Sequence, residues 1–374
     1  MKDARLHMSP HTKAKHKILK EYLKAWFPIL SKGSDRVLYL DGFAGPGEYD
    51  DGSFGSPVIA LEVARTHKLK LAAEVLFIFI EKEEHRYTHL TKLLKRLYGL
   101  RRDGMYERLP TNFRVYTYMG DFNKIMSNVV SELRAMGFNL APTLAFIDPF
   151  GYADINIQVL ADILSFPRCE LLITYMVNFL DRFASDEKHK DSIKKALLVN
   201  DTEIEALLSI SSKEQREKEW LRLLKERLLG YMRGRRQLEV YDLSFRTIDR
   251  HNNTMYYIVY FTKSTKGMSV MKEAMWKVGV DYKFSDFGFM PGQSSILDYS
   301  REKMWVPECS LAVHQHFTGK TVSVKEVEDY VTVKTKWLWR KSILEWLERH
   351  GKIEVLGRRT RMYTYPNGFM VKFK

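Results

Sequence analysis

Short apolar runs alternate with amphipathic segments through the first half of the chain. The runs predict strands, and the segments between them, whose apolar residues recur every three or four positions, predict helices. Strands are expected at 37–41, 75–81, 113–121, 142–148 and 169–176. Helices are expected at 57–67, 84–98, 122–137 and 155–165, with Ser56 as the N-cap of the first. This alternation predicts a mostly parallel sheet with helices on both faces.

An amphipathic helix is predicted before the first strand, at 12–30. Lysines lie opposite a broad apolar stripe on this helix. The stripe consists of Ile18, Leu19, Tyr22, Leu23, Trp26 and Phe27.

The alternation stops after residue 176. Residues 183–235 are charged and helical, with Trp220, Leu224 and Leu228 at four-residue spacing, which indicates an inserted helical subdomain. Strands at 238–249 and 254–264 are so close that they must pair as an antiparallel hairpin. A parallel sheet that ends in such a hairpin resembles the class I methyltransferases. We therefore expect an α/β fold with a doubly wound, Rossmann-like, mostly parallel seven-stranded sheet over residues 1–280.

The tail differs in character from the rest of the chain. Residues 281–306 have little periodicity and are expected to form a linker. Within 307–374, Ser323 and Glu326 form a capping-box pattern, residues 337–351 predict a helix, and 352–365 predict a basic hairpin. Two helices followed by a basic hairpin indicate a winged helix.

A glycine-rich loop follows the first strand and points to a cofactor site. Gly42, Gly45 and Gly47 let the backbone approach a ligand closely. Their spacing differs from the GxGxxG of a dinucleotide site, and the following helix begins too late to receive a pyrophosphate, so an NAD enzyme is disfavoured. Glu48, Asp50 and Asp51 in the same loop would also repel phosphate.

S-adenosylmethionine suits this loop better because it carries an ammonium and no phosphate. Acidic residues end three successive strands: Asp41 could receive the ammonium, Glu81 the ribose hydroxyls and Asp121 the adenine amino group. Other residues expected to bind the cofactor are Gly42, Phe43, Ala44, Gly45 and Gly47 along the loop, Lys82 beside Glu81, and Phe122 against the adenine ring.

The fourth strand ends in the sequence AFIDPFGY (145–152), the candidate for the chemistry itself. Similar DPPY or NPPF tetrapeptides end this strand in methyltransferases that act on nucleobase nitrogens, and DPFG resembles the motif of tRNA guanine-N2 dimethyltransferases. Asp148 and the carbonyl of Pro149 could orient an amino group toward the methyl donor. Phe150 or Tyr152 could stack on the base, with Gly151 between them. The alternative is that Asp-Pro only makes a turn.

A formal net charge of +14 favours an anionic partner, nucleic acid first. Asn178 and Arg182, after the fifth strand, lie on the expected substrate side of the sheet. Basic and aromatic residues of the tail are further candidates for nucleic-acid binding, namely Lys336, Trp337, Arg340 and Lys341 near the predicted recognition helix and Arg358 and Arg359 in the predicted wing. Trp337 and Trp339 could instead belong to the core, and winged helices also contact proteins.

Five separated blocks together resemble the three-Cys-motif partner (TcmP) family. They are KHKILKEYLKAWFPIL, LDGFAGPGEYDDGSFGSP, FIFIEK, AFIDPFGY and VNFLDRF, and they span about half of the chain. The resemblance implies a class I methyltransferase-like fold. It also implies a partner protein with three cysteines that is similar to radical-SAM enzymes.

Only Cys169 and Cys309 are present, far apart, so no disulfide framework or CxxC metal pair is expected. No apolar run approaches the length of a membrane span, and we expect a cytoplasmic protein without a membrane partner. The function that the sequence favours is an S-adenosylmethionine-dependent N-methyltransferase acting on a nucleobase in RNA or DNA. The alternative is a non-catalytic scaffold of the same fold that binds nucleic acid or the three-cysteine partner.

Overall fold

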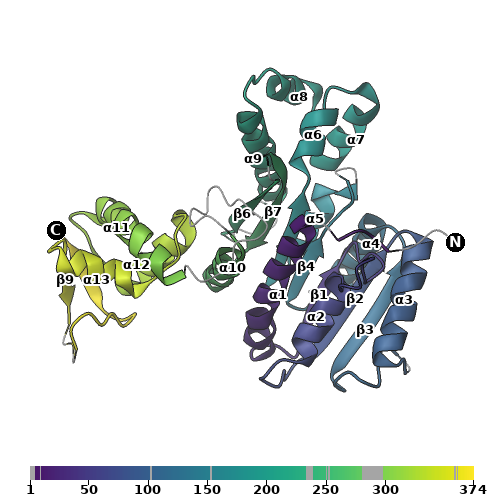
Figure 1. Ribbon diagram of the computed structural model, residues 1–374, viewed down its shortest axis with the longest axis horizontal. Helices are drawn as coiled ribbons and strands as arrows, with labels where there is room; N and C mark the ends of the chain where they lie inside the picture. The colour runs from purple at the N-terminus through teal and green to yellow at the C-terminus, as the bar shows by residue number, and fades with distance from the viewer. Residues whose placement is uncertain are drawn as a thin grey trace.

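The computed structural model describes residues 5–8, 10–101, 103–151, 154–232, 239–249, 251, 253–279, 298–357, 359 and 361–374. Its centre is a seven-stranded sheet with strand order β3-β2-β1-β4-β5-β7-β6 (Figure 1). The strands are β1 (Arg36–Asp41), β2 (Glu74–Glu81), β3 (Phe113–Met119), β4 (Thr143–Ile147), β5 (Cys169–Tyr175), β6 (Tyr241–Ile248) and β7 (Thr254–Thr262).

The first five strands are parallel, and β7 runs antiparallel to both β5 and β6. This strand order and this single reversal are those of the class I methyltransferase fold, as the sequence predicts. Because β1, β2, β3 and β4 are parallel, the residues that follow them meet at one edge of the sheet, the carboxyl edge.

Helices cover both faces of the sheet. The first face carries α1 (Pro10–Ser31), α2 (Ser56–Arg65), α3 (Glu84–Tyr98) and α10 (Thr265–Val278). The second face carries α4 (Phe122–Ala135) and α5 (Ile157–Ser165). Strand residues alternate between the two faces, since Val37 and Tyr39 belong to the first core and Leu38 and Leu40 to the second.

The N-terminal helix α1 lies along the first face and joins strands that are distant in sequence. Near its C-terminal half, the Tyr22 hydroxyl donates to Glu170 (2.6 Å) and contacts the Tyr260 hydroxyl (2.6 Å). The Trp26 indole donates to the same Glu170 carboxylate at 2.9 Å. Burial raises the pKa of Glu170, and these donors offset part of that cost. A buried acid inside an apolar strand is therefore explained by α1.

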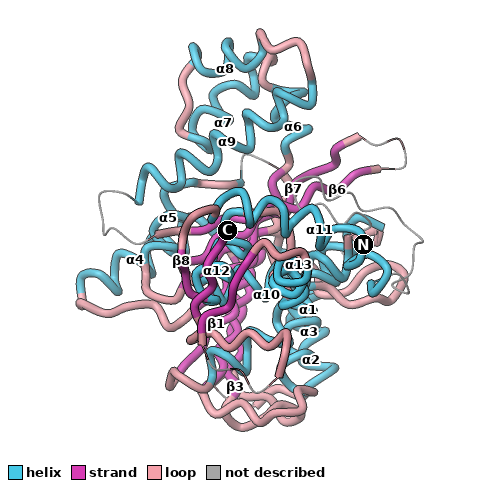
Figure 2. The backbone as a smooth tube through the Cα atoms, turned by 90° about the vertical axis from the view of Figure 1, so that its left-hand side faces the viewer, coloured by secondary structure: helices cyan, strands magenta, loops and turns pink. Residues whose placement is uncertain are grey.

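The helical insertion begins earlier than the predicted residue 183. It consists of α6 (Val177–Phe183), α7 (Glu187–Leu197), α8 (Asp201–Leu208) and α9 (Lys213–Met232). Its helix α9 packs against α5 on the second face of the sheet. Trp220, Leu224 and Leu228 of α9 are buried, as the pattern predicts. Helix α6 starts directly after β5, because the chain turns into the insertion at the carboxyl edge. Figure 2 shows α6 to α9 together as a separate helical layer.

The C-terminal unit contains α11 (Asp298–Phe317), β8 (Thr321–Ser323), α12 (Val324–Lys334), α13 (Lys341–Arg349), β9 (Ile353–Leu356) and β10 (Met370–Phe373). Its three strands form an antiparallel sheet in the order β8-β10-β9. The predicted capping box is confirmed, since the Glu326 amide donates to Ser323 Oγ at 3.1 Å and the Ser323 amide to Glu326 at 2.8 Å.

Several predicted boundaries in this unit are wrong. Helix α11 begins at Asp298, inside the expected linker 281–306, and residues 281–297 lie outside the described part of the chain. The helix predicted at 337–351 begins only at Lys341, because the chain bends at 335–337 and is irregular to 340, where it buries Trp337 and Leu338. The strand that pairs with β9 is β10, not residues 361–365.

Helix α10 connects the sheet to the C-terminal unit. The buried Lys272 ammonium donates to the carbonyls of Val331 (3.1 Å), Thr335 (2.7 Å) and Trp337 (3.0 Å). The next residue, Glu273, forms a two-point ion pair with Arg340. A lysine thus satisfies carbonyls at and beyond the C-terminal end of α12, where a helix lacks its own donors.

Candidate active site

The glycine loop and the DPF motif meet in one pocket at the carboxyl edge. The pocket has a volume of about 270 Å³ and is bounded by the two motifs and by α1. Its lining includes Phe43 to Tyr49 and Ser56 from the loop region, Asp148, Pro149 and Phe150 after β4, Met176 after β5, and Lys15 from α1. The two sequence motifs, about one hundred residues apart, therefore form one site because β1 pairs directly with β4.

The three glycines of the loop serve different purposes. A Cβ atom on Gly42 would lie 2.7 Å from the Phe122 ring, and one on Gly47 would lie 2.7 Å from Leu90. Gly45 has a φ of +62° and Gly47 a φ of +82°, which favour glycine. Only Gly45 has open space where a side chain would be. Thus the protein's own packing requires Gly42 and Gly47, and Gly45 is the glycine around which a ligand has room.

Glu81, at the end of β2, holds the glycine loop in place. Its carboxylate accepts from the Gly45 amide (2.8 Å) and from the Glu83 amide (2.8 Å). The side chain is 3% exposed. Each oxygen has a second lone pair that a ribose hydroxyl could use, so a structural role does not exclude the predicted one.

Asp41, at the end of β1, is fully buried. It accepts weak hydrogen bonds from the Phe43 amide (3.3 Å) and the Tyr39 hydroxyl (3.4 Å). The Ser56 hydroxyl also hydrogen-bonds to it, so Ser56 supports the acid rather than capping α2, whose N-cap is Gly55. Burial, together with the nearby charge of Asp148, raises the pKa of Asp41 to about 7. A cation bound beside this carboxyl group would stabilise its charged form.

Asp121 and Phe122 have roles within the chain. Asp121 is the N-cap of α4 and accepts from the Lys124 amide at 3.0 Å. Phe122 is 2% exposed and packs against Phe43, with ring centroids 5.5 Å apart. Phe43, not Phe122, is therefore the ring that lines the pocket. Lys82 is largely exposed and lies 3.9 Å from Asp154.

The main feature that sequence reasoning missed is an ion pair between Asp148 and Lys15 of α1. The Lys15 side chain is only 7% exposed and that of Asp148 only 17%. The Lys15 ammonium also lies 5.5 Å from the centre of the Tyr256 ring. One signal was available: Lys15 precedes Ile18 and Leu19 by three and four residues, which places it on the apolar stripe of the helix.

His16, next to Lys15, is buried as well. Burial and the adjacent Lys15 charge lower its pKa to about 3, so the ring is neutral. It packs against Tyr49 of the glycine loop with ring centroids 5.6 Å apart. Helix α1 thus brings a cation to Asp148 and a neutral ring to the loop.

The rest of the DPFGY motif is more open. Phe150 is 49% exposed, and the Arg86 guanidinium lies 4.2 Å from the centre of its ring. A Cβ atom on Gly151 would meet nothing within 4 Å. Tyr152 lies outside the described residues.

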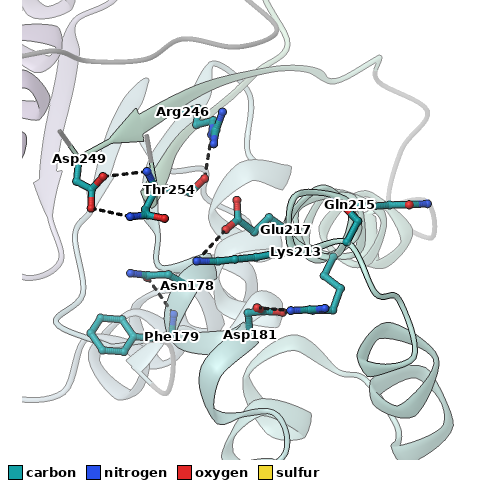
Figure 3. Close-up of polar contacts among 12 residues, drawn as sticks. Asn178, Phe179, Asp181, Lys213, Gln215, Glu217, Arg246, Asp249 and Thr254 are labelled. Carbon is teal, nitrogen blue, oxygen red and sulfur yellow. Dashed lines mark hydrogen bonds and ion pairs between the residues drawn. The ribbon is translucent and has the colours of Figure 1, made fainter. Parts of the chain in front are cut away.

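A polar cluster surrounds Asn178 at the start of the helical insertion (Figure 3). The Asn178 side-chain oxygen accepts from the Phe179 amide (2.9 Å), and Asp181 forms a two-point ion pair with Arg216. Burial raises the pKa of Glu217, which lies 4.0 Å from Lys213. Arg182 stacks on Phe183 instead, with its guanidinium 5.4 Å from the ring centre. None of these residues lines the pocket described above.

The basic residues of the tail are mostly paired within the chain. Arg340 contacts Glu273, Arg359 contacts Glu348 (2.5 and 2.9 Å), and Lys336 lies 3.3 Å from Glu308. Trp337 is 7% exposed and belongs to the core, as the alternative interpretation had it. Lys341 is exposed at the start of α13, and Arg358 lies outside the described residues. Nucleic-acid binding by this unit stays a prediction.

No protein-family model matches the chain, and no curated protein is similar to it in sequence. Among solved structures, Trm1 from Pyrococcus horikoshii, solved with S-adenosyl-L-methionine, covers 98% of this chain and 91% of its own at 12% identity, with a TM-score of 0.36. Protein LPL1258 from Legionella pneumophila covers 68% and 85% at 16% identity, with a TM-score of 0.35. These likenesses are weak, so the fold assignment rests on the strand order. Membership of the TcmP family stays a prediction.

Within the described residues, no group of three or more histidine, cysteine, aspartate or glutamate side chains could hold a metal ion. No helix in that part of the chain is both long enough and apolar enough to cross a membrane. Cys169 and Cys309 are both free and buried.

Proposed function

We propose that this protein is an S-adenosylmethionine-dependent N-methyltransferase that methylates a nucleobase in RNA or DNA. The observation that carries the proposal is the single pocket in which the glycine loop after β1 meets Asp148 and Pro149 after β4. On a sheet of this strand order, ligands bind outside the carboxyl ends of the strands, where this pocket lies.

The residues present fit the cofactor. Asp41 is buried and does not line the pocket, but it lies at the start of the loop, where it would attract the ammonium of the methionyl part. Its raised pKa is consistent with a carboxyl group that lacks a cation. The open side of Gly45 leaves room along the loop, and Phe43 offers an apolar wall. Glu81 would accept from the ribose while it holds Gly45. When bound, the cofactor supplies an electrophilic methyl group.

Asp148 would orient the acceptor. An exocyclic amine of a base is barely basic because its lone pair is delocalised into the ring. A carboxylate and a carbonyl that accept from its N–H groups turn that lone pair out of the ring plane and stabilise the positive charge that develops on nitrogen. Phe150, half exposed at the mouth, is placed to stack on the base.

Lys15 changes the picture of this step. Its ammonium occupies one side of the Asp148 carboxylate. The acceptor amine would use the remaining lone pairs or displace the lysine.

The same ion pair is the observation that favours the second candidate, a non-catalytic scaffold. If Lys15 never leaves Asp148, the site is closed to an amine and the pocket has only a structural role. In that case the basic surface would serve nucleic-acid binding, or the fold would bind the three-cysteine partner that resemblance to TcmP implies. The order of elements in the C-terminal unit, with strand order β8-β10-β9, supports a winged helix there. Two free, buried cysteines are consistent with action in the cytoplasm.

The experiment measures binding first and transfer second. Calorimetric titration with S-adenosylmethionine and with its demethylated product should show binding. Transfer of radiolabelled methyl groups to mixed cellular RNA and DNA should then be seen with the wild type and fall by ~10²–10⁴ with Asp148→Asn. Absence of cofactor binding at millimolar concentration would reject the methyltransferase proposal and favour the non-catalytic scaffold. Binding without transfer to any nucleic acid would reject the proposed acceptor.

A further inference from the structure

A second hollow lies at the free edge of the sheet, away from the candidate active site. It measures about 450 Å³ and runs between helix α3, the loop that follows it and edge strand β3. In Figure 1, α3 and β3 lie together at the sheet edge farthest from the C-terminal unit. The Val115 amide donates to the Gly104 carbonyl (2.8 Å), so the loop covers the N-terminal part of β3. Residues 116–119 form the part of this edge strand that the loop leaves uncovered. We call this hollow the β3 groove.

The charge of the β3 groove has one sign. Lys92 and Lys95 line it from one face of α3, and no carboxylate is among its lining residues. Both lysines are exposed, and among the described residues neither forms an ion pair. Other basic residues are paired with carboxylates: Arg96, on the same helix, with Glu48 and Arg340 with Glu273. Two unpaired cations one helical turn apart suit successive phosphates of a flexible strand.

Aromatic rings accompany these cations. Four tyrosines line the β3 groove, namely Tyr87, Tyr106, Tyr116 and Tyr118. Tyr118 is 45% exposed and its neighbour Met119 is 55% exposed, so apolar side-chain area is exposed at this end of β3. Interleaved aromatic and basic side chains are the features by which proteins bind single-stranded nucleic acid, since rings stack on bases and cations contact phosphates.

The position of the groove connects it to the candidate active site. Tyr118 and Met119 pair in register with Ile80 and Glu81 of β2, so the open end of the groove adjoins the carboxyl edge. From β3 to β4 there are three strand intervals, or about 14 Å. A strand of nucleic acid whose acceptor base lies at Asp148 would reach the groove within a few nucleotides.

We propose that the β3 groove binds single-stranded nucleic acid that flanks the acceptor base, with Tyr118 as a stacking platform and Lys92 and Lys95 as phosphate contacts. The substrate would then be a single-stranded segment or loop rather than a duplex. The inference rests on the proposed function for its biological meaning, but its binding test needs neither cofactor nor turnover.

The test is fluorescence anisotropy with the full chain and a fluorescein-labelled 20-nucleotide RNA of mixed sequence, with the same DNA sequence and an RNA duplex as comparisons. Lys92→Ala with Lys95→Ala should weaken single-strand binding at low salt and lower the slope of log affinity against log salt by about 1.4, since each phosphate contact on a single strand contributes about 0.7. The matched control is Lys68→Ala with Lys70→Ala, two exposed lysines with the same change of charge in the loop before β2.

Tyr118 gives a second measurement that charge does not affect. Tyr118→Ala should weaken binding by about 5- to 100-fold, and Tyr118→Phe should keep the wild-type affinity because the ring remains. Melting temperatures of all variants show that they are folded; an exposed tyrosine at this site makes loss of folding an unsuitable explanation for weaker binding.

The outcomes separate the two proposals. Any of three results overturns the groove proposal, even when methyl transfer is observed. The groove variants could bind like the control, the duplex could bind more tightly than the single strand, or the wild type could bind no nucleic acid. If the groove variants lose binding but no methyl transfer occurs, the groove stands and the methyltransferase proposal falls.

Discussion

Lys15, on the first helix, forms an ion pair with Asp148 at the end of β4, and both side chains are largely removed from water. An isolated charge in this position would be costly, because burial removes its hydration. Each charge therefore offsets part of the free-energy cost of burying the other. The N-terminal helix thereby becomes part of the candidate acceptor site, although the motif itself lies in the middle of the chain.

Breaking the Lys15–Asp148 pair from one side should destabilise the fold. Lys15→Met leaves Asp148 without its cation and should lower the free energy of unfolding by about 3–5 kcal/mol. Lys17→Met, an exposed lysine on the same helix, should change it by less than about 0.5 kcal/mol. In urea denaturation, Lys15→Met combined with Asp148→Asn should cost less than the sum of the single changes. Additive costs would show that the two groups do not interact.

Glu81 should affect cofactor binding through two contacts. Glu81→Ala removes both the predicted ribose acceptor and the anchor of the Gly45 amide, and should weaken binding of S-adenosylmethionine by about 1–3 kcal/mol in calorimetry. Glu83→Gln is the matched control, because Glu83 contributes its main-chain amide and its side chain is exposed. Equal affinities for both variants would remove Glu81 from the cofactor site.

Asp41 should make stability depend on pH. Its pKa is about 7 in the folded protein against an ordinary value of 3.8, so the folded state resists its ionisation. The stabilising effect of the protonated group is present below about pH 4 and is lost as pH rises to about 7. Asp41→Asn should therefore melt above the wild type at pH 8 and close to it at pH 4, with an upper limit of about 4 kcal/mol for the difference in free energy. The effect of His16 is common to both proteins and cancels in this comparison. A difference that does not vary with pH would contradict the assignment.

Lys272 should hold the C-terminal unit against the sheet. Lys272→Met leaves three carbonyls without their donor and should cost at least about 2 kcal/mol of stability. Limited proteolysis should also become faster within 298–374. The control is Lys277→Met on the same helix, where the lysine is 54% exposed and pairs with Glu21 at 3.1 Å. A surface ion pair of that kind contributes less than about 1 kcal/mol. If the two variants unfold alike, the connection between the units does not depend on Lys272.

The sheet could be predicted because its strands are short and continuously apolar. Parallel strands place their ends at one edge, so the positions of Asp41, Glu81 and Asp148 followed from the strand order alone. The glycine loop could be located for the same reason. The sequence could not show which glycine has room for a ligand. That depends on Phe122 and Leu90, which approach the loop from helices elsewhere in the chain.

Charged residues on apolar faces were the main source of error. The sequence pattern places the lysines of the first helix opposite its apolar stripe, in water, and gives no prediction for Lys272. Lysine is rarely buried, so neither burial was expected. Both can be buried because their ammonium groups have polar partners inside the protein: a carboxylate for Lys15 and three carbonyls for Lys272. Such partners come from distant segments, and local periodicity contains no information about them. Arg340 and Arg359 show the converse, since a basic run that looks like a binding surface is used for internal ion pairs.

The position of α1 has a consequence for the order in which the molecule is completed during synthesis. This helix is synthesised well before the groups that bury it, because Glu170 and Tyr260 follow Tyr22 by 148 and 238 residues. At a translation rate of about 5–20 residues per second, α1 waits roughly 12 to 50 s for its last partner. Until then part of its apolar stripe is open to chaperones, although Asp148, the partner of Lys15, is synthesised before Tyr260. Helix α1 therefore has its complete set of buried partners only after β7 has been synthesised.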